Sequence, residues 1–249
     1  MRNPTRRNRN IGTAKQGHGQ QNKLVIPDGN KDFRIFYERL GTYEKQERVI
    51  NGHTFLFVIE KNTASFRHAC TVKDVERMLS YISPADYGSL KLIVLRQPKR
   101  KEAILSPVWG RLIYAYEFED DFYPAVILEA ADYNSKLKWS RKLDPDDQQE
   151  LARLRRDGHN FTESKRNYTA LLEADHVRST QLYRTLLHEF GHYVHHLQVV
   201  KPFAEDQEKG EEIYLQLPKD EKEKFAHQYA DKLRERLLLE KLIPFERQV

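Results

Sequence analysis

The chain has 249 residues, which allows one large domain or two small ones, and 32% of them are charged. No apolar run approaches the roughly 18 residues needed to span a membrane, and the first residues lack the apolar stretch of a secretory signal. The single cysteine, Cys70, excludes an intrachain disulfide and is expected to be a small buried residue. A single cysteine is typical of a protein in a reducing compartment, so we expect a cytoplasmic protein. The lack of a long apolar run leads us to expect no membrane partner.

The net charge of +5 comes from the first residues of the chain. Residues 1–23 contain six of the 42 basic residues and none of the 37 acidic ones, which leaves the remainder at −1. This stretch is rich in Asn, Gln and Gly, so we expect a disordered basic tail over 1–23 and a single folded domain over 24–249. Nucleic acid is an expected partner only through this tail.

The first predicted element of the domain is a β-hairpin. Two β-rich runs, 48–50 and 53–59, flank the pair Asn51-Gly52, which is the strongest short-range hairpin signal. A helix over 72–82 should follow, because the residues from 71 to 74 resemble a capping box.

Strands dominate the next part of the chain. The pattern predicts strands over residues 90–95, 103–105, 111–116 and 125–129. A polar surface helix should run from the Asp-Pro pair at 144 to residue 156, and Gly158 should close it. Residues 168–172 are expected to form one more strand, just before a long helix. Strands followed by helices indicate an α+β fold.

The long helix contains the sequence His188-Glu189-Phe190-Gly191-His192. Apolar residues recur at helical spacing from residue 182 to 197, and the hydroxyls of Ser179 and Thr180 are candidate N-caps. Residues four apart share one face of a helix, so His188 and His192 can bind one metal ion with Glu189 beside it. A zinc site of this kind keeps one coordination position for water, whose proton a glutamate can accept.

A third ligand must come from another element, because three ligands on one straight helix lie too far apart along its axis. A helix is predicted over 219–242, and it carries Glu223 on a face made otherwise of small residues such as Ala226. Small residues let two helices approach closely, which favours Glu223 as the third ligand. His227 is the competing ligand, or hydrogen-bonds a metal-bound histidine. His195 and His196 are not expected to bind the metal directly.

Together the two helices resemble the zincin metallopeptidases of the gluzincin kind, and most closely the ImmA/IrrE-like metallopeptidases. The resemblance rests on the motif at 188–192 with His196, and on Glu223-x-x-Ala226-His227-x-Tyr229-Ala230 followed by leucines and Pro244. The chain departs from that pattern at His227, where Asn is usual, and at Tyr229, where Phe is usual. The same helices also resemble the lethal-factor-type endopeptidases.

The resemblance implies a zincin-like fold with a mixed, twisted sheet, the motif on an active-site helix and the third ligand on a C-terminal helix. Zn²⁺ on His188, His192 and Glu223 would activate water for the hydrolysis of peptide bonds, with Glu189 as general base. The implied partner is a protein or peptide substrate, including transcriptional regulators. Zincins bind an extended peptide at an edge strand, for which residues 168–172 are the expected candidate.

Two choices stay open at the level of sequence: the oxyanion donor and the function. The donor that stabilises the oxyanion could be Tyr193, Tyr214 or Tyr229. Two functions other than hydrolysis also remain: a nucleic-acid-associated regulator that uses the basic tail with the zincin fold as scaffold, and a zincin fold used for binding only.

Overall fold

The computed structural model describes residues 39–63, 65–99 and 108–248. They belong to one compact unit, Phe36–Val249. The expected basic tail over 1–23, the domain start at residue 24 and the strand over 103–105 lie outside the described residues.

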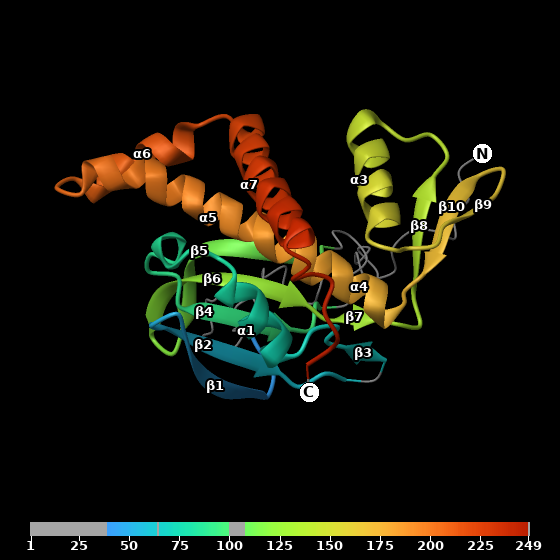
Figure 1. The fold of residues 1–249 in the computed structure, drawn as a ribbon, viewed down its shortest axis with the longest axis horizontal. Helices are drawn as coiled ribbons and strands as arrows, with labels where there is room; N and C mark the ends of the chain where they lie inside the picture. The colour runs from blue at the N-terminus through green and yellow to red at the C-terminus, as the bar shows by residue number, and fades with distance from the viewer. Residues whose placement is uncertain (1–38, 64, 100–107, 249) are drawn as a thin grey trace, which may run out of the picture. The chain divides into compact units, whose positions relative to one another are not determined.

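A five-stranded mixed sheet is the centre of this unit (Figure 1). Its strands, in spatial order, are β1 (Tyr43–Ile50), β2 (His53–Glu60), β4 (Leu92–Arg96), β6 (Asp121–Glu129) and β5 (Gly110–Phe118). The three central strands are parallel, whereas β1 and β5 run antiparallel to their neighbours at the two edges. The hairpin at Asn51-Gly52 is confirmed, and both residues have the positive φ that such a tight turn requires.

Two smaller sheets accompany the large one. The first has the order β8 (Lys136–Ser140), β10 (Asn167–Leu171), β9 (Thr162–Glu163), and the second pairs β3 (Phe66–Arg67) with β7 (Ala131–Asp132). The expectation that residues 168–172 form the edge strand for a peptide was wrong. β10 is the central strand of the small sheet, because β8 and β9 pair with its two sides.

The helices mostly follow the elements expected from the sequence. They are α1 (Val72–Ser80), α3 (Pro145–Arg156), α4 (Ala174–Thr180), α5 (Leu186–Val200), α6 (Gln207–Gln216) and α7 (Lys219–Leu239), with short 3₁₀ turns at Pro84–Asp86 and Lys201–Phe203. The capping box of Thr71 and Asp74 is present, and Asp144 caps α3. Most of the strands precede most of the helices along the chain, and the large sheet contains both parallel and antiparallel pairs. These two features confirm the α+β class with a mixed sheet.

The start of the motif helix differs from the expectation. Ser179 and Thr180 do not begin it, because α4 continues through a π-helical turn, Gln181–Thr185, directly into α5. Gln181 explains why this turn is fixed: its side-chain amide donates to the carbonyls of Trp109 and Glu129, at 2.9 and 2.6 Å. The turn thereby ties the helix to the ends of β5 and β6, and π-helical turns of this kind often occur at functional sites.

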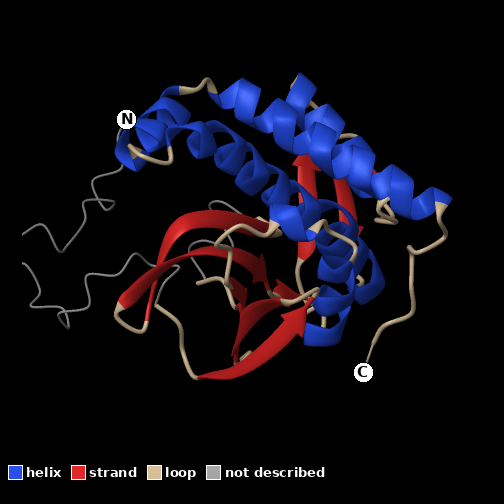
Figure 2. Cartoon of the chain, turned by 60° about the vertical axis from the view of Figure 1, so that its left-hand side comes forward, coloured by secondary structure: helices blue, strands red, loops and turns tan. Residues whose placement is uncertain are grey.

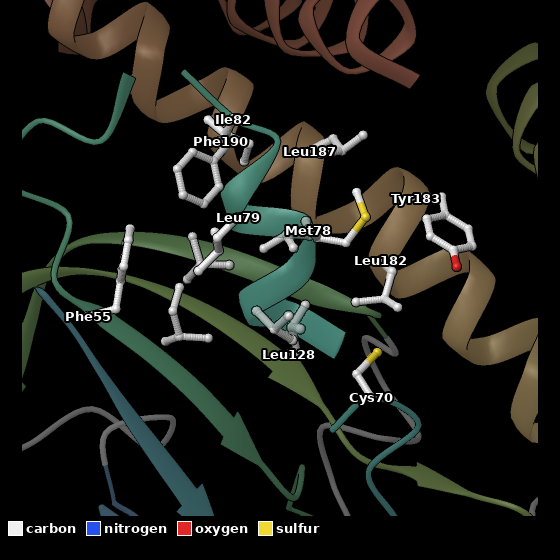
Figure 3. Close-up of a cluster of buried hydrophobic side chains, with 14 of the residues drawn as sticks. Phe55, Cys70, Met78, Leu79, Ile82, Leu128, Leu182, Tyr183, Leu187 and Phe190 are labelled. Carbon is white, nitrogen blue, oxygen red and sulfur yellow. The ribbon is translucent and has the colours of Figure 1, made fainter. Parts of the chain in front are cut away.

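The main core lies between the sheet and the helices α1, α4, α5 and α7, which cover one face of it (Figure 2). Figure 3 shows Met78 and Leu79 of α1 beside Leu182, Leu187 and Phe190 of the motif helix. Each of these five side chains is fully buried. The same cluster contains Cys70, which is 3% exposed, so its expected role as a small buried residue is confirmed.

A buried ion pair connects α1 to α4. Arg178 donates from Nε and Nη2 to the two carboxylate oxygens of Asp74, at 3.1 and 2.8 Å. Burial by itself would raise the pKa of Asp74, but the hydrogen bonds from Arg178 and from the backbone N–H groups of Gln248 and Thr71 hold it below its usual range. The pair therefore joins α1 to α4, the helix that leads into the motif helix α5.

Candidate metal centre

The motif helix α5 and the C-terminal helix α7 approach each other at Gly191 and Ala226. A Cβ atom added to Gly191 would lie 2.8 Å from both the Cα and the carbonyl oxygen of Ala226. Such a contact with backbone cannot be relieved by rotating a side chain. The glycine in the middle of α5 and the alanine on α7 therefore bring the two helices close enough to share a metal site.

Replacement of Gly191 by alanine should lower the free energy of unfolding by about 1–3 kcal/mol, because the helices must separate. Thermal or denaturant unfolding measures this change. Gly210→Ala is the matched control, since Gly210 is also helical but an added Cβ would meet its nearest neighbour at 3.1 Å. We expect it to change stability by less than about 1 kcal/mol. Equal effects of the two replacements would contradict the close contact at Gly191.

Three candidate donor atoms converge where the helices meet. His188 Nε2 and His192 Nε2 are 3.1 Å apart. Glu223 Oε2 lies 3.3 Å from the first of these atoms and 3.7 Å from the second. Zinc bonds of 2.0–2.1 Å in a tetrahedron place neighbouring ligand atoms about 3.3–3.4 Å apart. The donor atoms of the two helices therefore fit a single small cation.

His227 belongs to the same cluster. One atom from each of His188, Glu223 and His227 can be chosen so that all three lie within 4.8 Å of one another, a group that could hold a metal ion. The His227 ring packs on His188, with 4.4 Å between the ring centroids. His192 Nε2 lies 3.1 Å from His188 Nε2 and 3.7 Å from Glu223 Oε2, so we favour His192 as the ligand and His227 as the residue that supports His188.

The cluster sets the protonation of its members. Hydrogen bonds from His188 and His192 hold the pKa of Glu223 well below its usual range, so this carboxylate is ionised. Burial lowers the pKa of His227 to about 4, with a contribution from His188. His227 is therefore neutral near pH 7, as a metal ligand or a partner of one must be.

Glu189 lies beside the cluster, between α5 and β5. Its Oε2 accepts a hydrogen bond from the backbone N–H of Leu112, at 2.8 Å. Burial raises the pKa of Glu189, while the neighbouring imidazoles of His188 and His192 oppose that shift. A carboxylate held in this way, with a raised pKa, suits a group that accepts and returns a proton.

The bond from Leu112 also locates the free edge of the large sheet. Among residues 39–63, 65–99 and 108–248, β5 pairs with β6 alone, and the Leu112 N–H that reaches Glu189 lies on the opposite edge of the strand. β5, and not the strand at 168–172, is therefore the edge strand beside the metal cluster. The sequence predicts a strand here but carries no signal for which strand lies along α5.

Two other histidines of α5 do not join the cluster. His195 is 7% exposed and stacks on Phe225, with 4.4 Å between ring centroids and 10° between ring planes. His196 Nε2 lies 2.8 Å from the carboxylate of Glu211 on α6. Both therefore interact with other side chains, as expected for residues that do not bind the metal directly.

The three tyrosines proposed as oxyanion donors lie in different places. Tyr193 accepts a hydrogen bond from the backbone N–H of Ser89, at 2.8 Å, and Tyr229 donates to Asp86, at 2.9 Å. Tyr214 remains near the site, since its hydroxyl donates to the carbonyl of His192 at 3.3 Å. Tyr114 of β5 also lies here, with its hydroxyl 2.7 Å from that of Tyr214, and no sequence motif indicates it.

A cleft of about 620 Å³ opens beside the cluster. Its wall includes His188, Glu189 and His227, together with Gly110 and Arg111 of β5. Residues of β8 and α3 also line it. His188, Glu189 and His227 are therefore accessible from a cleft that β5 of the large sheet borders.

No family model, curated protein or solved structure matches this chain. The resemblance to zincin metallopeptidases rests on the residues of α5 and α7 and stays a prediction. Among the described residues, no helix combines the length and the apolar character needed to cross a lipid bilayer.

Proposed function

We propose that this protein is a zinc metallopeptidase that hydrolyses peptide bonds of a protein substrate. The observation that carries the proposal is the convergence of His188 Nε2, His192 Nε2 and Glu223 Oε2 on one point, with the carboxylate of Glu189 beside it. His188 and Glu189 line a cleft, so a substrate can approach them. Ligand binding alone would not need a glutamate in this position.

The donor set favours zinc over Mg²⁺ and Ca²⁺. Two imidazole nitrogens and one carboxylate oxygen form a known catalytic zinc ligand set, whereas Mg²⁺ and Ca²⁺ prefer oxygen ligands. A bound zinc ion would supply a Lewis acid for the scissile carbonyl and lower the pKa of a water molecule at its open position.

Glu189 has the central role among the protein's own groups. Its carboxylate takes a proton from the attacking water as general base and then delivers that proton to the leaving amine. The bond from the Leu112 N–H keeps one oxygen at the edge of β5, which orients the carboxylate. Glu223 and the two histidines hold the metal, and His227 supports the ring of His188.

The free edge of β5 gives the substrate its orientation. An extended peptide that pairs with this edge would lie along the cleft, directly beside Glu189. The backbone hydrogen bonds would hold the scissile bond in a fixed register. The site is therefore suited to an unfolded or loop segment of a protein.

Metal removal tests this function. The purified protein should cleave an unstructured protein such as casein, and dialysis against a chelator should abolish cleavage, because the ligands then hold no Lewis acid. Added Zn²⁺ should restore the rate, while Mg²⁺ should not. Electrophoresis follows the fragments, and elemental analysis follows the metal. Undiminished cleavage by protein shown to be free of metal would refute the proposal.

A further inference from the structure

The strand β8 borders the same cleft as the candidate metal ligands. Four consecutive residues of β8, Lys136 to Trp139, line it together with His188 and Glu189. Successive side chains of a strand point to opposite faces, so a strand that contributes consecutive residues borders the cleft with its edge. The other edge of β8 pairs with β10 along its whole length. The edge of β8 that pairs with no strand in the described part of the chain therefore faces the cleft.

The two faces of β8 differ in chemistry. Leu137 and Trp139 are half-buried on one face, whereas Lys136 and Lys138 are exposed on the other. Alternate residues of a strand are about 6.6–6.8 Å apart, so each face presents two equivalent side chains at that spacing. A strand paired with β8 would place its own alternate residues against these two faces.

The lysines provide charge that the protein itself does not balance within the described part of the chain. Two other cations of the cleft wall have carboxylate partners: Arg111 lies 3.4 Å from Glu129, and Arg184 lies 2.8 Å from Glu150. Neither Lys136 nor Lys138 has an ion-pair partner among the residues at 39–63, 65–99 and 108–248. This face of β8 is therefore complementary to an acidic partner.

We propose that β8 binds the protein substrate as an extended strand in which apolar residues alternate with Asp or Glu. The inference rests on the proposed function and names the class of segment that this function would act on. The apolar side chains pack on Leu137 and Trp139, and the acidic ones pair with Lys136 and Lys138. Backbone hydrogen bonds to the free edge provide affinity, while the alternation provides specificity.

A binding experiment tests this proposal without requiring hydrolysis. The zinc-loaded Glu189→Gln full-length protein is titrated with fluorescently labelled octapeptides, and binding is followed by anisotropy. One peptide alternates Leu and Glu, a second has the same composition in two blocks, and a third alternates Leu and Lys. We expect the alternating acidic peptide to bind at least about tenfold more tightly than either of the others.

Charge reversal identifies the strand responsible. The double variant Lys136→Glu, Lys138→Glu, in the same Glu189→Gln background, should bind the acidic peptide about tenfold more weakly and should bind the Leu–Lys peptide more tightly than before. Lys142→Glu is the matched control, because Lys142 is an exposed lysine just beyond β8 that does not line the cleft. It should leave both affinities unchanged. Hydrogen exchange of alternate amides in β8 should slow when the acidic peptide binds.

Equal binding of the alternating and blocked peptides would overturn the proposal, as would unchanged affinities in the double variant. These failures are separate from failure of the peptidase function, which casein cleavage reports by itself. Casein cleavage without peptide selectivity would show that β8 does not determine the substrate specificity. The proposed peptidase function would then still stand. Selective binding that reverses with the lysines would support β8 as the binding strand even in a protein that cleaves nothing.

Discussion

Replacing Glu223 by alanine is expected to remove zinc from the purified protein. The variant should lose more affinity than the roughly 10–100-fold that typically follows loss of a residue that only supports a ligand. The reason is geometric, since Glu223 Oε2 lies 3.3 and 3.7 Å from the two imidazole nitrogens and supplies the only charged donor of the set. Elemental analysis after gel filtration gives the metal content, and competition with a chromophoric chelator gives the affinity.

Two variants of the same helix provide the comparison. Glu221→Ala removes an exposed carboxylate two residues earlier on α7 and should leave zinc binding unchanged. His227→Ala removes the ring that packs on His188 and should weaken zinc binding by about 10–100-fold at most. Zinc that persists in Glu223→Ala but disappears in His227→Ala would show that His227, and not Glu223, completes the site.

The contact between α5 and α7 could be anticipated because it depends on residue size. A glycine within one helix and small residues on the other indicated a close approach, and the 2.8 Å distance from a Cβ on Gly191 to Ala226 confirms it. Ala226 and Ala230 are both buried, whereas Glu223 on the same face stays partly exposed at the cluster. Spacing in the sequence therefore predicted which carboxylate would approach the histidines.

The identity of the edge strand could not be anticipated, because edge and central strands have similar patterns. Residues 168–172 precede the motif helix in sequence, but β8 and β9 occupy both sides of that strand. β8 itself was not predicted, because the alternation of Lys136 and Lys138 with Leu137 and Trp139 is short and gives only a weak strand signal. The strand beside the site is β5, and the bond from the Leu112 N–H to Glu189 shows its position.

The predicted start of the motif helix was wrong for a different reason. Ser179 and Thr180 have good N-cap side chains, but a cap forms only where the preceding backbone leaves the helix. Here α4 and the π-helical turn continue the helical path, and the side chain of Gln181 bonds to two strand ends. A tertiary contact therefore decides the local structure at this point, and no neighbouring residue indicates it.

The most severe loss of activity is expected from Glu189→Gln. Hydrolysis of casein should fall by at least about 10²–10⁴-fold, because an amide cannot accept the proton of the attacking water or return it to the leaving amine. Glutamine has nearly the same shape and keeps an oxygen that can accept the Leu112 N–H. Zinc content and thermal stability should therefore remain close to those of the unsubstituted protein, so the loss reports proton transfer and not folding.

Glu211→Gln serves as the control for removing a carboxylate near the helix. Glu211 is exposed on α6, pairs with His196 and does not line the cleft, so the hydrolysis rate should stay unchanged. Because burial raises the pKa of Glu189, its carboxylate is suited to gain and release a proton beside the cluster. Full hydrolysis by a zinc-loaded Glu189→Gln protein would exclude general-base catalysis by Glu189 and leave the proton acceptor unassigned.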